Sequence, residues 1–478
     1  MKLTMGEVAG FIGASSGVPD RHVRGYSIDS RTLLPGDLFF AIRGPRFDGH
    51  KFVGQVLEKG AAGVIVEQAF YASAEVECRP SMCAVADTRG ALQVISRSVR
   101  RKWGKPLLAV TGSTGKSTTK EMIAAILGQR FVVLRSPGNL NNDFGLPLAL
   151  LGLEPEHDIA VMELGMSAAG EIARLARLAE PQVGVVTNVA PAHLQFFDSV
   201  DAIALAKREL VDYLATTGPN AVAVLNEDDE RVRKFAEGFP GRVVTFGFSD
   251  KATFRALDVK SGTGIGSAFR VVSPEWQAEF TLPLPGWYNI QNALAAIAAS
   301  SMYAIPPEEM PPALAGFQNL HQRSEILTLP REVTVINDCY NSNPLAMESM
   351  LQALTSWPGA RRRIVVAGEM LELGPTAPEL HRGVGRKCAQ SGAAWVIGIQ
   401  GDAKSLVEGA IEGGIPPLQG QFFPDAKLAG EFCQTLIAPG DLILVKGSRG
   451  VHLETVIEML KKQNSGVRSQ ESQSKLET

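Results

Sequence analysis

The chain of 478 residues lacks the features of disulfide-bonded and membrane-spanning proteins. Its five cysteines, at positions 78, 83, 339, 388 and 433, form no CxxC pair and no Cys/His cluster, so we expect reduced thiols. No apolar run approaches the roughly 18 residues that a membrane-spanning helix needs. The first residues, MKLTMGEVAGFIGA, include Glu7 and lack the uninterrupted apolar core of a secretory signal.

An excess of charge of either sign is also lacking. The 47 Lys and Arg residues nearly balance the 50 Asp and Glu residues, which argues against a protein that coats nucleic acid with cations. A hydrophobic content of 45% excludes a mainly disordered chain. We therefore predict a cytoplasmic protein with no nucleic-acid partner and no membrane insertion. We expect a monomer, although composition and charge do not determine the oligomeric state.

The length suits about three domains, at roughly 150 residues each. The pattern of apolar residues changes near residues 103 and 322, so we predict domains at 1–103, 104–322 and 323–462. The last residues, 463–478, are polar and contain several Ser and Gln, so we predict a disordered tail there.

Short apolar runs alternate with amphipathic segments through most of the chain, which predicts an α/β fold with parallel sheets covered on both faces. In the middle domain the predicted strands are Leu107–Val110, Phe131–Leu134, Ile159–Met162, Val183–Val186 and Ala221–Leu225. In the third domain, which we predict to be Rossmann-like, they are Val333–Ile336, Arg363–Ala367, Trp395–Ile399 and Leu442–Val445. In the first they are Asp37–Ile42, Gly63–Glu67 and Met82–Val85, with a helix near Ala91–Arg101.

A glycine-rich loop, TGSTGKSTT, follows the strand LLAV and precedes the helical segment KEMIAAIL. In that position backbone N–H groups and the helix dipole favour phosphate, Lys116 provides a cation, and Ser117 provides a hydroxyl for magnesium. Val110 stands where the GxxxxGK[ST] pattern has its first glycine, so the loop has the shorter TGxxGK[ST] form. A coincidental glycine turn is the alternative. The predicted ATP-binding residues of the loop are Thr111, Gly112, Ser113, Thr114, Gly115, Lys116, Ser117 and Thr118.

Two candidate metal ligands follow predicted strands. Glu163 comes at the end of IAVM, and His193 follows the strand that ends in VVTN. Because ligands gather at the carboxyl ends of parallel strands, both are placed to reach magnesium. The alternatives are a helix-cap or loop carboxylate for Glu163 and a structural role for His193.

Lys207 lies in the helical segment SVDAIALAKRELVDYL, on the same face as Ile203, Leu210 and Leu214. A lysine on an apolar face either extends to the surface or has a specific partner and a lowered pKa. Its position soon after His193 favours the second alternative.

These motifs together resemble those of the Mur ligases, which are ATP-dependent amide-forming enzymes of bacterial cell-wall precursor synthesis. The resemblance covers nearly the whole chain except the tail. It implies that Lys116 and Ser117 bind ATP, that Ser117, Glu163 and His193 hold two magnesium ions, and that Lys207 is carbamylated to help hold one of them.

Further segments extend the resemblance to the nucleotide. In PGWYNIQNALAA, Asn289 and Asn292 match the adenine-side motif, although Tyr288 stands where histidine is frequent. Arg323, in HQRSE, matches an arginine that reaches the ATP phosphates from the domain junction. The segment NDCYNSNP matches a third-domain loop that closes onto the ribose, with Asp338, Tyr340 and Asn341.

Three segments extend the resemblance within the family. The run SIDSRTLLPGDLFFAIRGPRFDGHKF is similar to the UDP-binding N-terminal domain. The runs RSPGNLNNDFGLPLALL and VVAGEMLELGPTAPELHRGVG resemble members that add D-alanyl-D-alanine. The residues assigned in this way to the UDP-peptide are Ser30, Arg31, Asp48, His50 and Asn142.

Lys446 and Arg449, in VKGSRG, follow a predicted strand. They would either meet a carboxylate of the incoming dipeptide or form a basic loop that closes a strand–helix junction. The sequence leaves these two alternatives open.

The resemblance implies that D-alanyl-D-alanine is joined to UDP-N-acetylmuramoyl-tripeptide through an acyl phosphate, with ATP and two magnesium ions as cofactors. Lys116, His193, Lys207 and Arg323 are then the expected catalytic residues. The DNPR-type motif of relatives that add the third amino acid is absent. The alternatives are a ligase that adds a single amino acid, a folylpolyglutamate-type synthetase, a small-molecule kinase with a phosphate-binding loop, and a nucleotide-switched binding module.

Overall fold

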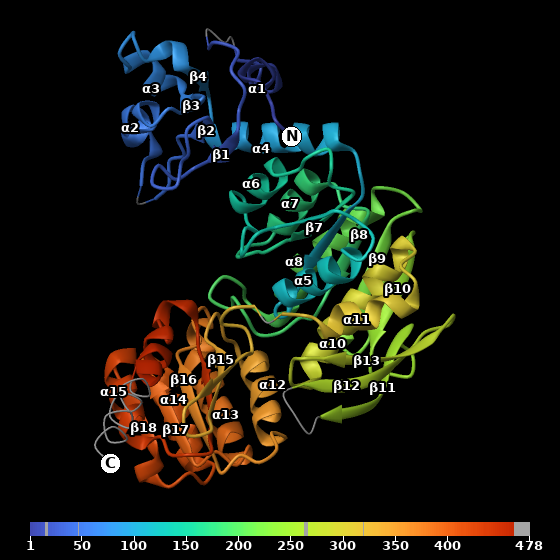
Figure 1. The fold of residues 1–478 in the computed structure, drawn as a ribbon, viewed down its shortest axis with the longest axis vertical. Helices are drawn as coiled ribbons and strands as arrows, with labels where there is room; N and C mark the ends of the chain where they lie inside the picture. The colour runs from blue at the N-terminus through green and yellow to red at the C-terminus, as the bar shows by residue number, and fades with distance from the viewer. Residues whose placement is uncertain (15–17, 46, 262–265, 319, 463–478) are drawn as a thin grey trace, which may run out of the picture.

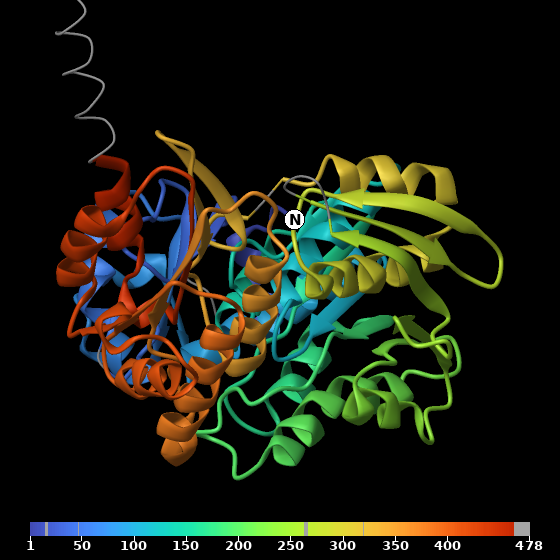
Figure 2. The ribbon, with the colours of Figure 1, turned by 90° about the horizontal axis from the view of Figure 1, so that it is seen from below.

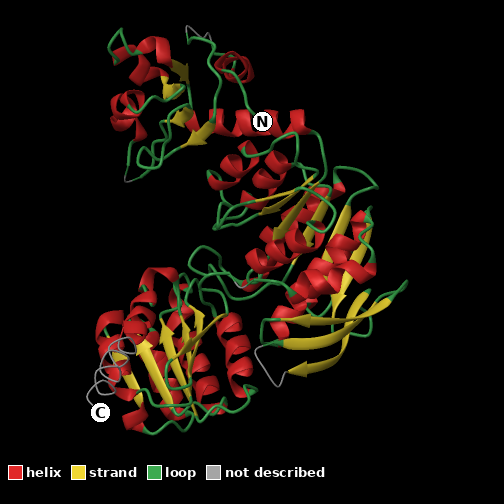
Figure 3. Ribbon diagram, viewed as in Figure 1, coloured by secondary structure: helices red, strands yellow, loops and turns green. Residues whose placement is uncertain are grey.

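The protein forms three regions, each built on its own sheet and flanked by helices (Figures 1 and 3). We call them the first, middle and third regions in chain order. This computed structural model describes residues 1–14, 18–45, 47–261, 266–318 and 320–462. The predicted α/β class is confirmed, whereas the tail predicted at 463–478 lies outside the described residues. None of the described helices has the length and apolar character to cross a membrane.

The first region contains a parallel sheet with the strand order β1-β2-β3-β4 among the described residues. The strands are β1 (Gly25–Ser27), β2 (Asp37–Phe40), β3 (Gly63–Glu67) and β4 (Met82–Val85). The helices are α1 (Met5–Ile12), α2 (Val53–Glu58), α3 (Gln68–Ser73) and α4 (Thr88–Trp103).

The middle region has nine strands within the described residues, in the order β13-β12-β11-β10-β9-β8-β5-β7-β6. The first six in sequence are β5 (Leu107–Thr111), β6 (Val133–Arg135), β7 (Ile159–Glu163), β8 (Val183–Val186), β9 (Val222–Asn226) and β10 (Arg242–Gly247). They pair in parallel. The strand predicted at Phe131–Leu134 begins and ends later in the chain than predicted, as β6. Three further strands, β11 (Phe254–Ser261), β12 (Ser267–Val272) and β13 (Gln277–Leu282), extend the sheet.

The strands β11, β12 and β13 pair antiparallel, which the sequence analysis did not predict. Burial along β12 alternates between buried and half-buried residues. Such alternation is typical of an antiparallel strand with one face on the core, and it contains no continuous apolar run. A search for continuous runs therefore overlooked this part of the sheet.

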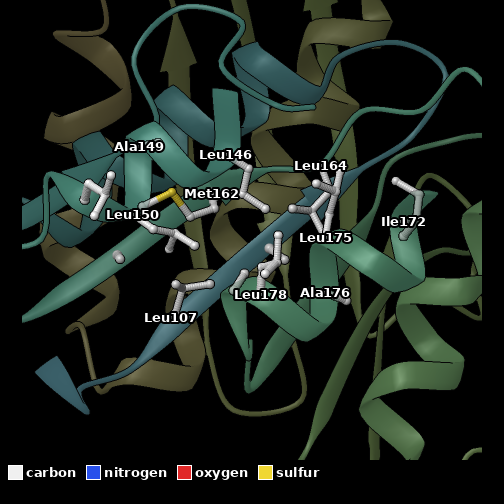
Figure 4. Close-up of a cluster of buried hydrophobic side chains, with 14 of the residues drawn as sticks. Leu107, Leu146, Ala149, Leu150, Met162, Leu164, Ile172, Leu175, Ala176 and Leu178 are labelled. Atoms are coloured by element: carbon white, nitrogen blue, oxygen red, sulfur yellow. The ribbon is translucent and has the colours of Figure 1, made fainter. Parts of the chain in front are cut away.

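Helices cover both faces of the middle sheet, as predicted. They are α5 (Lys116–Leu127), α6 (Gly145–Leu151), α7 (Glu171–Ala179), α8 (Val200–Ala215), α9 (Glu230–Arg233), α10 (Trp287–Ser300) and α11 (Met310–Ala315). Alternate residues of β5 belong to two different apolar cores: Leu107 packs with α6 and α7, as Figure 4 shows, and Leu108 packs with α5 and α10. The period of two along the strand thus divides its side chains between the two helical layers.

Helix α4 joins the first and middle regions. It ends at Gly104, whose φ of 68° is the left-handed conformation that favours glycine. Its buried residues Leu92, Ile95 and Val99 belong to the same apolar core as Leu146 of α6. The first region is therefore packed against the middle region through a shared core (Figure 1).

The third region has a sheet with the order β14-β15-β19-β16-β17-β18 among the described residues. The strands are β14 (Glu325–Leu329), β15 (Val333–Asp338), β16 (Arg362–Gly368), β17 (Trp395–Ile399), β18 (Gly420–Phe423) and β19 (Asp441–Lys446). The helices are α12 (Pro344–Thr355), α13 (Ala377–Gln390), α14 (Ala403–Glu412) and α15 (Ala426–Leu436). All pairs are parallel except that of β14 with β15, and α12 lies on the side that faces the middle region (Figures 1 and 2).

Candidate active site

A cleft of about 1330 Å³ opens between the middle and third regions. Its middle-region wall contains the glycine-rich loop, Glu163 and His193, all at the carboxyl ends of parallel strands. Its opposite wall contains Asp338, Asn341 and neighbouring loops of the third region. The predicted nucleotide residues from two distant parts of the chain therefore face one space.

The glycine-rich loop connects β5 to α5. At Gly115 the φ angle is 79°, and a Cβ atom there would lie 2.1 Å from Asn292 Oδ1. At Gly112 a Cβ atom would lie 1.9 Å from Thr187 Oγ1. Both glycines are needed for this close approach, and no side chain caps the N-terminus of α5. The free N–H groups at this helix end suit a phosphate.

Lys116 is folded over this loop. Its Nζ donates to the carbonyl of Gly112 at 2.9 Å. Burial lowers the pKa of Lys116, Glu163 opposes this shift, and Arg323 adds to it. The ammonium therefore lies where phosphate oxygens would approach the loop.

Glu163, at the end of β7, is held by side chains from two other elements. Ser117 Oγ donates to Glu163 Oε2 at 2.6 Å, and Asn141 Nδ2 donates to Oε1 at 2.8 Å. No three His, Cys, Asp or Glu side chains of the described residues converge as a metal cage. Magnesium usually takes one or two carboxylates together with waters and phosphates, so the hydroxyl and carboxylate of Ser117 and Glu163 fit that ion.

His193 lies in the left-handed conformation, with a φ of 61°. Its Nδ1 is 2.5 Å from Oε2 of Glu372, a residue of the third region. This hydrogen bond lowers the pKa of Glu372. The sequence analysis proposed His193 as a ligand and named the segment that contains Glu372, but it gave Glu372 itself no role, although this residue lines the cleft beside His193.

Lys207 is buried on α8, with 2% of its surface exposed. Ile203, Leu210 and Leu214 are fully buried on the same face, as the helical period predicted. No described residue forms a hydrogen bond or ion pair with the Lys207 ammonium. Burial, with repulsion from Lys116, lowers its pKa well below the ordinary value. The lowered pKa favours the neutral amine, and burial of the side chain excludes the alternative of a lysine extended to the surface.

The adenine-side residues hold α10 in place. Asn292 Oδ1 accepts from Thr119 Oγ1 at 3.3 Å, and Asn289 Nδ2 donates to the carbonyl of Pro285 at 2.8 Å. Both asparagines line the cleft. Trp287 also lines it, and its buried Nε1 has no hydrogen-bond partner among the described residues.

Tyr288 also lines the cleft. Its hydroxyl is 2.7 Å from Ser324 Oγ and 2.6 Å from Met350 Sδ, so it links α10 to the third region. Arg323 lies next to this junction, with its guanidinium 4.0 Å from the centre of the Tyr340 ring. Arg323 also lines the cleft, as the predicted phosphate contact requires.

Lys446 and Asp338 form an ion pair at the ends of β19 and β15, with 2.5 Å between Nζ and Oδ2. Lys446 Nζ also donates to the carbonyl of Asn341 at 3.0 Å. These contacts fit the alternative in which Lys446 closes a loop against a strand end. Arg449 donates to Gln322 Oε1 at 2.5 Å and lines the cleft.

Comparison with known proteins agrees with this arrangement. The Mur ligase family catalytic domain matches residues 22–128, the Mur ligase middle domain matches 110–300, and the Mur ligase glutamate ligase domain matches 322–449. The UDP-N-acetylmuramoyl-tripeptide–D-alanyl-D-alanine ligase of Bacillus subtilis strain 168 is 33% identical over 92% of this chain and 93% of its own length. The chain belongs to the Mur ligase family.

Other relatives agree with this family. The ligase of the same name from Escherichia coli K12 is 35% identical over 90% of this chain and 92% of its own length. A crystal structure of MurF from Acinetobacter baumannii has a TM-score of 0.87 at 29% identity, covering 97% of this chain and 99% of that one. MurF ligase from Thermotoga maritima, solved in complex with ADP, has a TM-score of 0.81 at 26% identity, covering 93% and 98%.

In this Mur ligase four of the residues predicted for UDP, Ser30, Arg31, Asp48 and His50, lie in the first region and do not line the cleft, whereas Asn142 belongs to the middle region and lines it. His50 is buried: its Nε2 accepts from the Glu67 N–H at 3.0 Å, and its Nδ1 is 2.7 Å from Asp48 Oδ1. Arg31 forms an ion pair with Asp29 rather than with Asp48, and its side chain is 86% exposed. The carbonyl oxygen of Ser30 accepts a hydrogen bond from Lys59 Nζ. Asp48 and His50 are thus brought together, and Arg31 remains free to turn toward a ligand.

Asn142 and Asn141 have different contacts in this Mur ligase. Asn142 Oδ1 accepts from the N–H groups of Phe144 and Gly145 at the start of α6. Asn141, which was not predicted, bonds to Glu163 instead. The sequence analysis assigned Asn142 to the UDP-peptide and made no prediction for Asn141 or for a partner of Glu163.

Proposed function

We propose that this Mur ligase uses ATP to join D-alanyl-D-alanine to UDP-N-acetylmuramoyl-tripeptide. The observation that carries this proposal is the similarity, over at least nine-tenths of the chain, to relatives named for that activity. The ADP complex of the Thermotoga maritima relative supports ATP as the nucleotide.

The chemistry requires that the tripeptide carboxylate be activated, because oxide is not a leaving group. A carboxylate oxygen attacks the γ-phosphorus of ATP and ADP leaves, which forms an acyl phosphate. The dipeptide amine then attacks the acyl carbon, loses a proton and expels inorganic phosphate.

Lys116 and Arg323 provide the positive charge that the first step needs, because it brings two anions together. Ser117 and Glu163 would hold one magnesium ion, and His193 and a carbamate on Lys207 would hold a second. Bound magnesium would screen the phosphate charge and polarise the γ-phosphoryl group. Water must be kept from the acyl phosphate, and the cleft between the two regions suits that purpose.

The remaining residues of the proposal bind the substrates. Asn289 and Asn292 would contact the adenine side, and Asp338 and Asn341 the ribose. Arg449 would approach the dipeptide carboxylate, whereas Lys446 is held by Asp338. The UDP-peptide residues would be Ser30, Arg31, Asp48, His50 and Asn142.

The proposed domain limits are 1–103, 104–322 and 323–462. The first falls at the end of α4 and the second between α11 and β14. We also propose that the protein is a cytoplasmic monomer without a nucleic-acid partner.

The decisive experiment measures phosphate and ADP release from ATP with each substrate alone and with both. We expect release only when UDP-N-acetylmuramoyl-tripeptide and D-alanyl-D-alanine are both present, together with a new peptide bond detected by mass spectrometry. A kinase would form ADP and a phosphorylated product without free phosphate. A nucleotide switch would hydrolyse ATP without either substrate. D-alanine in place of the dipeptide tests the alternative of a ligase that adds a single amino acid.

A further inference from the structure

Glu372 of the third region contacts the middle region at the candidate ligand His193. The two side chains meet with 2.5 Å between Oε2 and Nδ1, although 179 residues separate them in sequence. The carbonyl of Glu372 also accepts from the Gln195 N–H at 3.0 Å. Side chain and main chain of one residue therefore hold the same turn.

The segment 372–374 fits closely against residues 193–195. A Cβ atom on Gly374, which has a φ of 62°, would lie 3.0 Å from the carbonyl oxygen of Leu194. Glu372 and His193 both have left-handed backbones, with φ angles of 65° and 61°. Non-glycine residues adopt that conformation only where surrounding contacts stabilise it, so the two segments are shaped for each other.

The hydrogen bond also determines which imidazole nitrogen can bind a metal. An ionised carboxylate only accepts hydrogen bonds, so the Nδ1 of His193 carries the proton and Nε2 keeps its lone pair. No group of the described residues bonds to Nε2, and His193 lines the cleft. Carboxylates that orient a metal-binding histidine in this way are common, and their loss weakens metal affinity.

We propose that Glu372 is a positioning residue, which orients His193 for the second metal only while the third region is docked on the middle region. This inference rests on the proposed function, because it takes His193 as the second-metal ligand. It assigns to a residue of the third region a role in assembling a metal site of the middle region. Docking of the third region and formation of that site are then coupled.

The test uses Mn²⁺ as the probe, and electron paramagnetic resonance counts the free and bound ions on the full-length protein with a non-hydrolysable ATP analogue. We expect two bound ions in the wild type. Glu372→Ala should weaken the weaker site roughly 10- to 100-fold and leave the tighter site unchanged. Glu372→Gln, which keeps an acceptor for Nδ1–H, should have a smaller effect. Glu379→Ala, which removes an exposed carboxylate of the same region, is the matched control and should change neither site.

The same titration in a His193→Ala background separates positioning from a general structural role. If Glu372 acts through His193, the substitution Glu372→Ala has no further effect there. An equal loss in both backgrounds, unchanged Mn²⁺ binding in Glu372→Ala, or a single Mn²⁺ site in the wild type would each overturn the inference. The titration needs no turnover, so failure of the wild type to release phosphate would contradict the proposed function separately.

Discussion

At the scale of single residues, three lysines of the middle region, the half-buried Lys116 and the buried Lys120 and Lys207, differ in their partners. Lys120 Nζ donates to the Ser136 carbonyl at 2.5 Å and lies 3.1 Å from Glu121. Lys116 donates to the carbonyl of Gly112. Lys207 is as buried as Lys120, but no described residue pairs with it. Burial without a partner favours the neutral amine, which is the form that adds carbon dioxide.

We therefore predict that Lys207→Ala loses most of the ligase activity and that a short carboxylic acid in the buffer partly restores it. Lys207→Arg keeps the charge but cannot form a carbamate, so it should remain inactive. The measurement is phosphate release with both substrates, and Lys234→Ala on the surface is the control. Full activity in Lys207→Arg, or of the wild type in bicarbonate-free buffer after prolonged dialysis at low pH, would show that no carbamate is needed.

Arg31 is available for a ligand because its exposed side chain pairs only with Asp29. We predict that Arg31→Ala raises KM for the UDP-peptide roughly tenfold or more, the effect of losing one charge-assisted hydrogen bond. KM for ATP should hardly change, since Arg31 does not line the cleft. Steady-state kinetics with each substrate varied in turn measures both constants. Arg21→Ala, at another exposed arginine of the first region, is the control, and an equal rise of both KM values would indicate a structural role.

At the scale of elements, the glycine-rich loop depends on how closely α5 and α10 approach. A Cβ atom on Gly115 would overlap Asn292 Oδ1, and the φ of 79° disfavours any other residue. We predict that Gly115→Ala raises KM for ATP more than tenfold, because the loop must shift away from the position that binds phosphate. Nucleotide binding measured by calorimetry checks this.

The matched control for this prediction is Gly10→Ala in α1. A Cβ atom at Gly10 meets nothing within 4 Å, and the residue lies inside a helix. Alanine there should leave ATP binding unchanged and stabilise the fold by up to about 1 kcal/mol. Unchanged ATP binding in Gly115→Ala would contradict the assignment of the loop.

Helix α13 supports the segment that contains Glu372 through one histidine. His381 is fully buried, its Nε2 accepts from the Met370 N–H at 2.9 Å, and its Nδ1 is 2.7 Å from the Ala377 carbonyl. Burial lowers the pKa of His381 below 6.5 despite the hydrogen bond to Ala377, which raises it. His381 therefore binds a proton less readily in the folded protein than in the unfolded chain.

This shift predicts a pH dependence of stability. The unfolded state binds more protons below pH 6.5, so the stabilisation is complete above that pH and is lost as the pH falls through the folded pKa. Thermal unfolding of the wild type between pH 5 and pH 8 should show this loss, and His381→Gln should show a weaker dependence. Parallel curves for the two proteins would contradict the prediction.

At the scale of the whole molecule, the site belongs to neither the middle nor the third region alone. Tyr288 links the two regions at Ser324, and Glu372 links them again at His193. Loops of both regions line the same cleft. Ligands that contact both walls would therefore draw the regions together.

We predict that small-angle scattering shows a smaller radius of gyration when a non-hydrolysable ATP analogue and UDP-N-acetylmuramoyl-tripeptide are both added. The physical reason is that Asp338 and Asn341 would dock on nucleotide already held by the glycine-rich loop. Each ligand alone provides the comparison. An unchanged radius with both ligands would indicate a rigid site.

The sequence alone determined the features that depend on neighbouring residues. The motif TGSTGKSTT predicted the turn between β5 and α5, and the period of 3.6 predicted that Lys207 shares a buried face with Ile203 and Leu210. Continuous apolar runs predicted the buried parallel strands. These signals are local, because one helix or strand contains all of the residues that produce them.

Only the tertiary structure decided which side chains meet across the cleft. It pairs His193 with Glu372 and joins Asn141 to Glu163. It also holds Lys446 with Asp338, and it extends the middle sheet with the antiparallel strands β11–β13. The physical reason is that these contacts join elements far apart in the chain, and packing of the sheets and helices brings them together. A period along one element contains no information about the residue that faces it from another.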